Sequence, residues 1–143
     1  NTTPVVPINA NQPVGEVLVF VEQSMGEVQP VGLELLGAGR RLADKLERPL
    51  TAIVLGSNLG DIPKTLIAYG ADKVYVADHP ELEQYRTLPY RRVICNWLEQ
   101  MDVEPHTMLL GSTTTGRDLA PRIAAHFKTG LTADTTELDI GPY

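Results

Sequence analysis

The sequence predicts an α/β fold, in which a doubly wound and mostly parallel sheet of five strands forms a single domain. Short continuous apolar runs alternate along the chain with longer segments whose apolar residues recur at helical spacing. Runs that are apolar at every position are typical of strands buried on both faces, as in a parallel sheet covered by helices. The chain of 143 residues is also long enough for one domain with a substantial core.

The expected elements follow one another in a regular alternation of strand and helix. The first apolar run leads into a helical pattern that opens with Pro30, a residue suited to the first helical turn. A later short helix has Asp61 as its candidate N-cap and Gly70 as its stop. The predicted strands are 17–23, 51–56, 73–78, 107–111 and a fifth within 131–140, and the predicted helices are 30–46, 61–71, 88–101 and 116–127.

Residues 1–15 differ in composition from the rest of the chain, because they contain three prolines and several Asn and Thr residues. We interpret this stretch as a flexible tail or linker that precedes a domain at 16–143. It has neither a basic start nor an apolar core, so it does not have the character of a secretion signal.

The composition excludes several classes of partner. Lys and Arg number 12 and Asp and Glu number 18, and the resulting net charge of −6 provides no electrostatic footprint for nucleic acid or for an anionic membrane surface. No apolar run approaches transmembrane length. The single cysteine, Cys95, rules out an internal disulfide; it does not mark a compartment, but it fits the reducing cytoplasm that we expect better than it fits a disulfide scaffold.

The stretch GSTTTGRDLAPRIAAHF, at 111–127, begins with two glycines at the spacing of a phosphate-binding loop. That motif continues with Lys and then Ser or Thr, which hold the phosphates and magnesium. Here Arg117 and Asp118 follow instead, and we expect the aspartate to repel phosphate. The structural alternative is a turn from strand to helix that is capped by Thr114 or Thr115. A dinucleotide-binding fingerprint after the first strand is missing as well.

No catalytic or metal-binding residue is expected. The histidines His79, His106 and His126 are scattered without a partner at metal-ligand spacing, and we expect them at the surface or at helix ends. Cys95 lies in a helical pattern, where we expect a packed thiol. The sequence offers no Ser/His/Asp or Cys/His arrangement for nucleophilic catalysis.

Three longer segments carry a family resemblance: VLVFVEQSMGEVQPVGLELLGAGRRLADKL, YGADKVYVAD and LLGSTTTGRDLAPRIAAHFKTGLTADTTEL. Together they resemble the N-terminal domain of the electron transfer flavoprotein alpha subunit, over residues 16–141. The resemblance implies an adenine-nucleotide-hydrolase-like (Rossmann-like) fold and pairing with a beta subunit. It further implies electron transfer between dehydrogenases, such as acyl-CoA dehydrogenases, and their acceptors. In that family FAD is held mainly by a C-terminal alpha domain, which is absent from this chain, so no tightly bound cofactor is expected on the chain itself.

The same resemblance assigns the candidate cofactor-contacting residues. In bifurcating members a second flavin, held by the beta subunit, lies against this domain, and the matching loop faces it with Arg117 near the isoalloxazine. In other members the beta subunit holds AMP and the loop serves the subunit interface, and the sequence leaves both alternatives open. The candidates are Thr113, Thr114, Thr115, Gly116 and Arg117, followed by Thr132 and Asp134.

An alternative from another class is a free-standing nucleotide-binding module like the universal stress proteins, which share the fold. Those proteins use a late glycine-rich loop for the phosphates of ATP. In this sequence only the loop that begins at Gly111 could serve that purpose.

Overall fold

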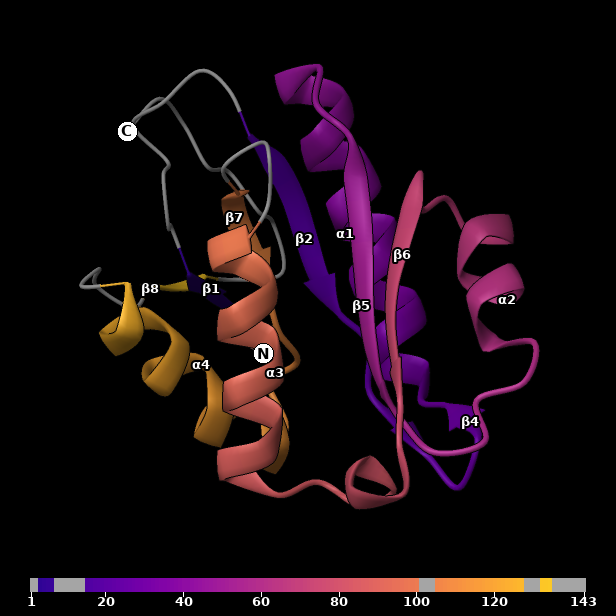
Figure 1. Cartoon of the computed structure of the whole chain (residues 1–143). Helices are drawn as coiled ribbons and strands as arrows, with labels where there is room; N and C mark the ends of the chain where they lie inside the picture. Colours follow the sequence, from indigo (N-terminus) through magenta and orange to yellow (C-terminus); the bar gives the residue numbers. More distant parts are fainter. Residues whose placement is uncertain (1–2, 7–14, 101–104, 128–131, 135–143) are drawn as a thin grey trace.

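The computed structural model describes residues 3–6, 15–100, 105–127 and 132–134. Within these residues, a sheet of six strands runs through the centre in the order β6-β5-β2-β7-β1-β8 (Figure 1). Its strands are β1 (Thr3–Val6), β2 (Glu16–Phe20), β5 (Leu50–Gly56), β6 (Lys73–Asp78), β7 (Pro105–Leu109) and β8 (Thr132–Asp134). The helices are α1 (Pro30–Leu46), α2 (Ile62–Ala68), α3 (Thr87–Gln100) and α4 (Thr114–His126), and a turn of 3-10 helix, η1 (Pro80–Leu82), precedes α3. A separate hairpin consists of β3 (Gln23–Ser24) and β4 (Glu27–Val28).

The sheet is mostly parallel, which confirms the predicted fold class. Strand β2 runs parallel to both β5 and β7, and β5 runs parallel to β6. Helices α1 and α2 cover one face of the sheet and α3 and α4 cover the other (Figure 1). In β2, Val17 and Val19 belong to the core on the α1 side, while Leu18 and Phe20 belong to the core on the α3 side. Successive side chains of a strand point to opposite faces, so a strand covered on both sides is apolar at every position.

The N-terminal stretch corrects the prediction of a tail at residues 1–15, because residues 3–6 form strand β1 inside the sheet. β1 pairs antiparallel with β7 on one side and with β8 on the other. Val5 and Val6 are 1% and 0% exposed and belong to the cores on opposite faces. Two adjacent β-branched residues fill both layers at once, which favours a strand in spite of the prolines nearby. Residues 1–2 and 7–14 of the predicted tail lie outside the described residues.

The five predicted strands correspond to β2, β5, β6, β7 and β8, and β1 is a sixth strand that the sequence pattern did not reveal. The first strand is shorter than predicted, because the chain turns after Phe20 into the β3–β4 hairpin. Its two-residue turn has positive φ at both Met25 (52°) and Gly26 (81°), the geometry that fits the twist of paired strands. Gly70, the predicted stop of α2, has a φ of 117°.

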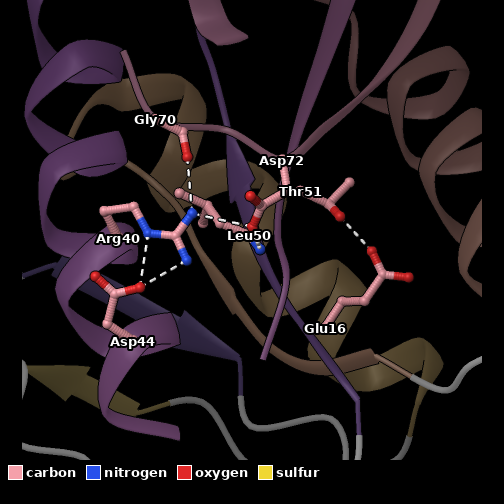
Figure 2. A network of polar contacts seen from close by, with 7 residues as sticks. All are labelled: Glu16, Arg40, Asp44, Leu50, Thr51, Gly70 and Asp72. Atoms are coloured by element: carbon pink, nitrogen blue, oxygen red, sulfur yellow. Dashed lines mark hydrogen bonds and ion pairs between the residues drawn. The ribbon is translucent and has the colours of Figure 1, made fainter. Parts of the chain in front are cut away.

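One edge of the sheet, where β2, β5 and β6 begin, is held by a network of polar contacts around Arg40 of α1 (Figure 2). The guanidinium lies 2.8 Å from Asp44 Oδ1 and 3.0 Å from Asp72 Oδ2, and it donates to the carbonyl of Gly70 at 2.9 Å. Asp72 also accepts a hydrogen bond from the Leu50 amide at 2.8 Å. That amide, followed by Arg40, lowers the pKa of the Asp72 carboxyl below its usual value. The network joins α1 to the start of β5 and to the turn before β6.

Glu16, at the start of β2, is a buried carboxylate beside this network (Figure 2). It accepts a hydrogen bond from the hydroxyl of Thr51 and lies 2.8 Å from the ammonium of Lys73. A buried carboxylate needs such partners, because a buried charge without them is very costly. All of these charges therefore serve the packing of the edge where the parallel strands begin.

Candidate functional site

The loops at the opposite, carboxyl edge of the parallel strands form the candidate site. The β3–β4 hairpin follows β2, residues 57–61 follow β5, η1 follows β6, and a short turn joins β7 to α4. In Figure 1 the hairpin, η1 and the first turn of α3 lie together at the lower edge. Ligands of open parallel sheets bind in the crevices at this edge, so the side chains presented here are the ones to consider for function.

The loop after β5 is fixed by the carboxylate at the end of β6. Asp78 accepts hydrogen bonds from the amides of Asn58 and Leu59 at 2.9 and 3.0 Å. The exposed Asn58 has a φ of 56°, a conformation that asparagine tolerates better than most residues. Asp78 therefore has a structural role, and the loop approaches the hairpin through the Asn58 carbonyl, which lies 3.5 Å from the position of a Cβ at Gly26.

Thr113 caps helix α4, where the sequence had predicted a cap at Thr114 or Thr115. Its hydroxyl accepts a hydrogen bond from the Gly116 amide at 3.0 Å, and its backbone is extended, as an N-cap requires. The same hydroxyl donates to Glu22 Oε2 at 2.6 Å. The Thr113 side chain thus links the first turn of α4 to the segment that follows β2.

The two glycines at phosphate-loop spacing pack against each other. A Cβ at Gly116 would lie 1.9 Å from the carbonyl oxygen of Gly111, so no other residue fits there without a shift of the backbone. A Cβ at Gly111 would lie 2.8 Å from Glu22 Oε2. The spacing is therefore accounted for by close packing between the turn, the helix start and Glu22.

Arg117 extends from the first turn of α4 into solvent. Its amide donates to the Thr113 carbonyl at 2.9 Å, and its guanidinium donates to the hydroxyl of Ser112 at 3.1 Å. A guanidinium has five N–H donors, so the contact with Ser112 leaves most of them available to a ligand or partner. A cation at this end of a helix is slightly unfavourable for the helix dipole.

Asp118 is directed toward α3 and the segment before it. Its Oδ2 accepts hydrogen bonds from the hydroxyls of Thr87 at 2.6 Å and Tyr85 at 2.7 Å, and these bonds lower the pKa of the carboxyl. Arg122, one turn further along α4, lies 2.9 Å from its Oδ1. Partial burial and the bond to Asp118 raise the pKa of Tyr85 to about 12. Asp118 is thus engaged on the α3 side, and the expectation that it repels phosphate from the loop stays a prediction.

Glu22 is the residue of this edge that the sequence reasoning missed. It follows the first strand directly, inside a segment that the fold places at the carboxyl edge, but an isolated glutamate there has no distinguishing pattern. Its contacts with Thr113 and Gly111 make it part of the loop of interest.

Comparison with known proteins identifies the family. The sequence matches the family described as "Electron transfer flavoprotein domain" over residues 17–142. The chain belongs to the electron transfer flavoprotein family. The resemblance seen in the sequence is thereby confirmed, and nothing in the described residues favours the stress-protein alternative.

Several relatives of this chain carry names that refer to electron transfer. It is 52% identical over 124 residues to "Protein FixB" of Clostridium saccharobutylicum and 49% identical over the same length to "Electron transfer flavoprotein subunit alpha" of Clostridium acetobutylicum. Each alignment covers 87% of this chain and 36% of the relative. It is also 47% identical to "Acryloyl-CoA reductase electron transfer subunit beta" of Anaerotignum propionicum, over 87% of this chain and 34% of that protein. The chain therefore spans about a third of the length of the curated relatives it matches.

The fold does not bring all predicted site residues together. Thr113 to Arg117 lie side by side at the start of α4, whereas Thr132 and Asp134 belong to β8, two strands away from β7. Both β7 and β8 pair with β1, and Val5 is level with Leu109 on one side and with Thr132 on the other. Strands are about 4.8 Å apart, so β8 lies about 10 Å from β7 along the sheet.

The cysteine and two of the histidines singled out in the sequence are packed against other parts of the fold. Cys95 is buried, as expected, and burial raises the pKa of its thiol. His106 is also buried, contrary to the expected surface position, because β7 is an internal strand of the sheet. His126, at the end of α4, lies 2.6 Å from Glu99 of α3. Among the described residues no group of three His, Cys, Asp or Glu side chains is placed to hold a metal, and no helix has the length and apolar character needed to cross a membrane.

Proposed function

We propose that this chain is the N-terminal domain of an electron transfer flavoprotein alpha subunit, which pairs with a beta subunit and shapes the surroundings of a flavin. The observation that carries the proposal is the family match over residues 17–142, together with relatives at about half identity, one of which is named as an electron transfer flavoprotein alpha subunit. The relatives are much longer, and we propose that FAD is held mainly by the part of such a protein that follows this domain.

The loop at the start of α4 is the part of the domain that we propose faces the flavin or the partner subunit. Arg117 supports this role, because it is exposed and stands at the edge of the sheet where ligands bind. We propose Thr113, Thr114, Thr115 and Gly116 as its companions and Thr132 and Asp134 as more distant contributors.

The domain has a supporting role in this proposal and performs no catalysis of its own. Its partners are the beta subunit, FAD and, through the complex, acyl-CoA or related dehydrogenases. The name of the relative from Anaerotignum propionicum, an acryloyl-CoA reductase electron transfer subunit, supports the last of these. A cytoplasmic location completes the proposal.

The test is the variant Arg117→Ala in the complete alpha–beta complex, with the midpoint potentials of the flavins measured by spectroelectrochemistry. A guanidinium near a flavin stabilises the reduced, anionic ring, so its removal is expected to lower the potential of that flavin. Arg92→Ala is the matched control, because it removes an equal charge from an exposed position on α3.

Two results of this experiment would contradict the proposal. One is equal potentials and equal subunit affinity in wild type and Arg117→Ala. The other is a complex of full-length alpha and beta subunits that binds no flavin.

A further inference from the structure

Helices α3 and α4, which cover one face of the sheet (Figure 1), carry more positive than negative charge. They contain four arginines and two acidic residues, although the chain has a net charge of −6. Both acidic residues already join the two helices. Asp118 of α4 accepts a hydrogen bond from the hydroxyl of Thr87 of α3. Glu99 of α3 lies 2.6 Å from His126 of α4. The arginines of this face therefore outnumber the carboxylates that the two helices provide.

These two contacts mark the seam along which α3 and α4 meet, and two arginines belong to it. Arg91 follows Thr87 by one helical turn on α3. Arg122 follows Asp118 by one turn on α4. Residues four apart lie on the same side of a helix, so both arginines lie at the seam, one turn beyond the contact between Thr87 and Asp118. Burial raises the pKa of the Cys95 thiol, and the nearby charge of Arg91 opposes this rise, which places Arg91 on the same side of α3 as that buried residue.

One of the two arginines lacks a hydrogen-bond acceptor. Asp118 Oδ1 lies 2.9 Å from Arg122, whereas the Nε of Arg91 is buried and has no hydrogen-bond partner among the described residues. The other oxygen of Asp118 is taken as well, because it accepts from Tyr85 and Thr87. A buried donor without an acceptor is costly and rare in folded proteins. Arg91 therefore marks a place for an acceptor from another molecule.

The chemistry of that acceptor follows from the guanidinium. Arg91 is half-buried, so part of the side chain is open to solvent at the mouth of the seam. A guanidinium is a planar fork, and a turn that points Nε and a terminal amino group outward lets it hold both oxygens of a carboxylate. Leu88, three residues earlier on α3, is 65% exposed and neighbours Arg91 on the helix surface. The site thus combines a cation that has an unused donor with an apolar side chain in solvent.

We propose that the seam between α3 and α4 is a docking site for an acidic segment of a partner protein, in which one carboxylate binds Arg91 and an apolar neighbour covers Leu88. A free anion would meet the arginine alone, where water and salt screen the attraction. A protein segment also gains the burial of Leu88, and its negative charge complements the excess of arginine on this face. Such docking goes beyond the electron-transfer proposal, because it uses no residue of the loop at 111–117.

The experiment is a calorimetric titration of the chain with a short capped peptide of alternating glutamate and leucine. We expect this peptide to bind at least about tenfold more tightly than the same peptide with glutamine in place of glutamate, the difference that a charge-assisted hydrogen bond provides. Inorganic phosphate at equal ionic strength is the third ligand, and it is expected to bind more weakly than the acidic peptide. Equal binding of the two peptides would overturn the proposal. Tighter binding of phosphate would also overturn it, because the seam would then be a site for a free anion.

The variant Arg91→Met separates docking from a structural role, because methionine keeps an unbranched stem but has neither the charge nor an N–H donor. The variant is expected to bind the acidic peptide about tenfold more weakly. In thermal unfolding it should match wild type or exceed it, since an apolar group in place of an unsatisfied donor costs little. Arg41→Met is the matched control, because it removes an equal charge from an exposed position of α1, on the other face of the sheet. Its affinity for the peptide should equal that of wild type.

Nuclear magnetic resonance of the wild-type chain gives a reading that does not depend on the folding of a variant. The acidic peptide is expected to shift the Nε–H resonance of Arg91 and to leave that of Arg41 in place. Binding that leaves the Arg91 resonance unchanged would rule the site out. The same conclusion would follow from an equal loss of affinity in Arg91→Met and Arg41→Met, or from a clearly lower unfolding temperature of Arg91→Met.

Discussion

A Cβ atom at Gly116 would lie 1.9 Å from the carbonyl oxygen of Gly111, so the first turn of α4 packs directly on the turn that follows β7. This contact between Gly111 and Gly116 gives a structural reason for both glycines, although the lysine of the phosphate-loop motif is missing. Each glycine allows the close approach of another part of the chain, and the capping hydroxyl of Thr113 accepts a hydrogen bond from the Gly116 amide.

Gly116→Ala is therefore expected to destabilise the domain by about 3 kcal/mol, because the added methyl meets backbone atoms that cannot rotate away. The measurement is chemical denaturation followed by circular dichroism. Gly37→Ala is the control, since a Cβ there has its nearest contact at 3.7 Å, with the flexible end of Arg41. That change is expected to be neutral or to stabilise by up to about 1 kcal/mol, because alanine favours a helix interior. Equal effects of the two changes would contradict this account of the turn.

Strand β1 is expected to contribute to stability although it lies near the N-terminus. Val6→Ala removes buried methyl groups from the core and should cost about 2 kcal/mol in the free energy of unfolding. Val76→Ala, on the edge strand β6, removes the same atoms from a side chain that is 39% exposed and should cost about 0.5 kcal/mol. If Val6→Ala were as mild as Val76→Ala, β1 would not be a firm part of the sheet.

The bonds from Tyr85 and Thr87 to Asp118 predict a dependence of stability on pH. Because these bonds hold the pKa of Asp118 below its ordinary value of 3.8, the carboxylate stabilises the folded state above that value. The contribution is lost as the pH falls from the ordinary value through the folded pKa. We expect Asp118→Asn to be less stable than wild type at neutral pH and the difference to shrink in acid. Denaturation curves at a series of pH values measure it, and a difference that stays constant down to strongly acidic pH would contradict the assignment.

Because of His106, we expect stability to depend on pH in a second range, above that of Asp118. Burial, followed by the charge of Arg48, lowers the pKa of this imidazole below its ordinary value of 6.5. The unfolded chain therefore binds a proton that the folded chain does not, and stability falls as the pH drops from about 6.5 through the folded pKa. The variant His106→Gln should lack this decline. Nuclear magnetic resonance of the imidazole protons gives an independent reading, and an ordinary or raised pKa for His106 would contradict the prediction.

The sequence reveals the strands and helices whose signals are local. Strand β5, from Leu50 to Gly56, is buried at every position. A nearly continuous apolar run is typical of a strand that is covered by helices on both faces. Helix α1 has its buried leucines at helical spacing, so the pattern alone specifies both the helix and its inner face. β1 was missed because four residues with a proline among them are too short to carry a pattern.

The candidate site was only partly predictable. Its place at the carboxyl edge and the candidates from Thr113 to Arg117 came from the order of elements and from the family resemblance. The cap was misplaced by a residue or two, since Thr113, Thr114 and Thr115 have the same side chain and only the turn geometry selects one of them. The partners of Asp118 could not be predicted, because Tyr85 and Thr87 belong to a different part of the chain.

By itself, then, the sequence determined the α/β architecture and the family, since both are encoded in continuous stretches of residues. Only the tertiary structure decided which charges stand at the loop. Glu22 and Thr113 are separated by 91 positions in the chain and meet because β2 and β7 are neighbours in the sheet. Strand order and register depend on how whole faces pack against each other, and no local pattern of residues records that choice.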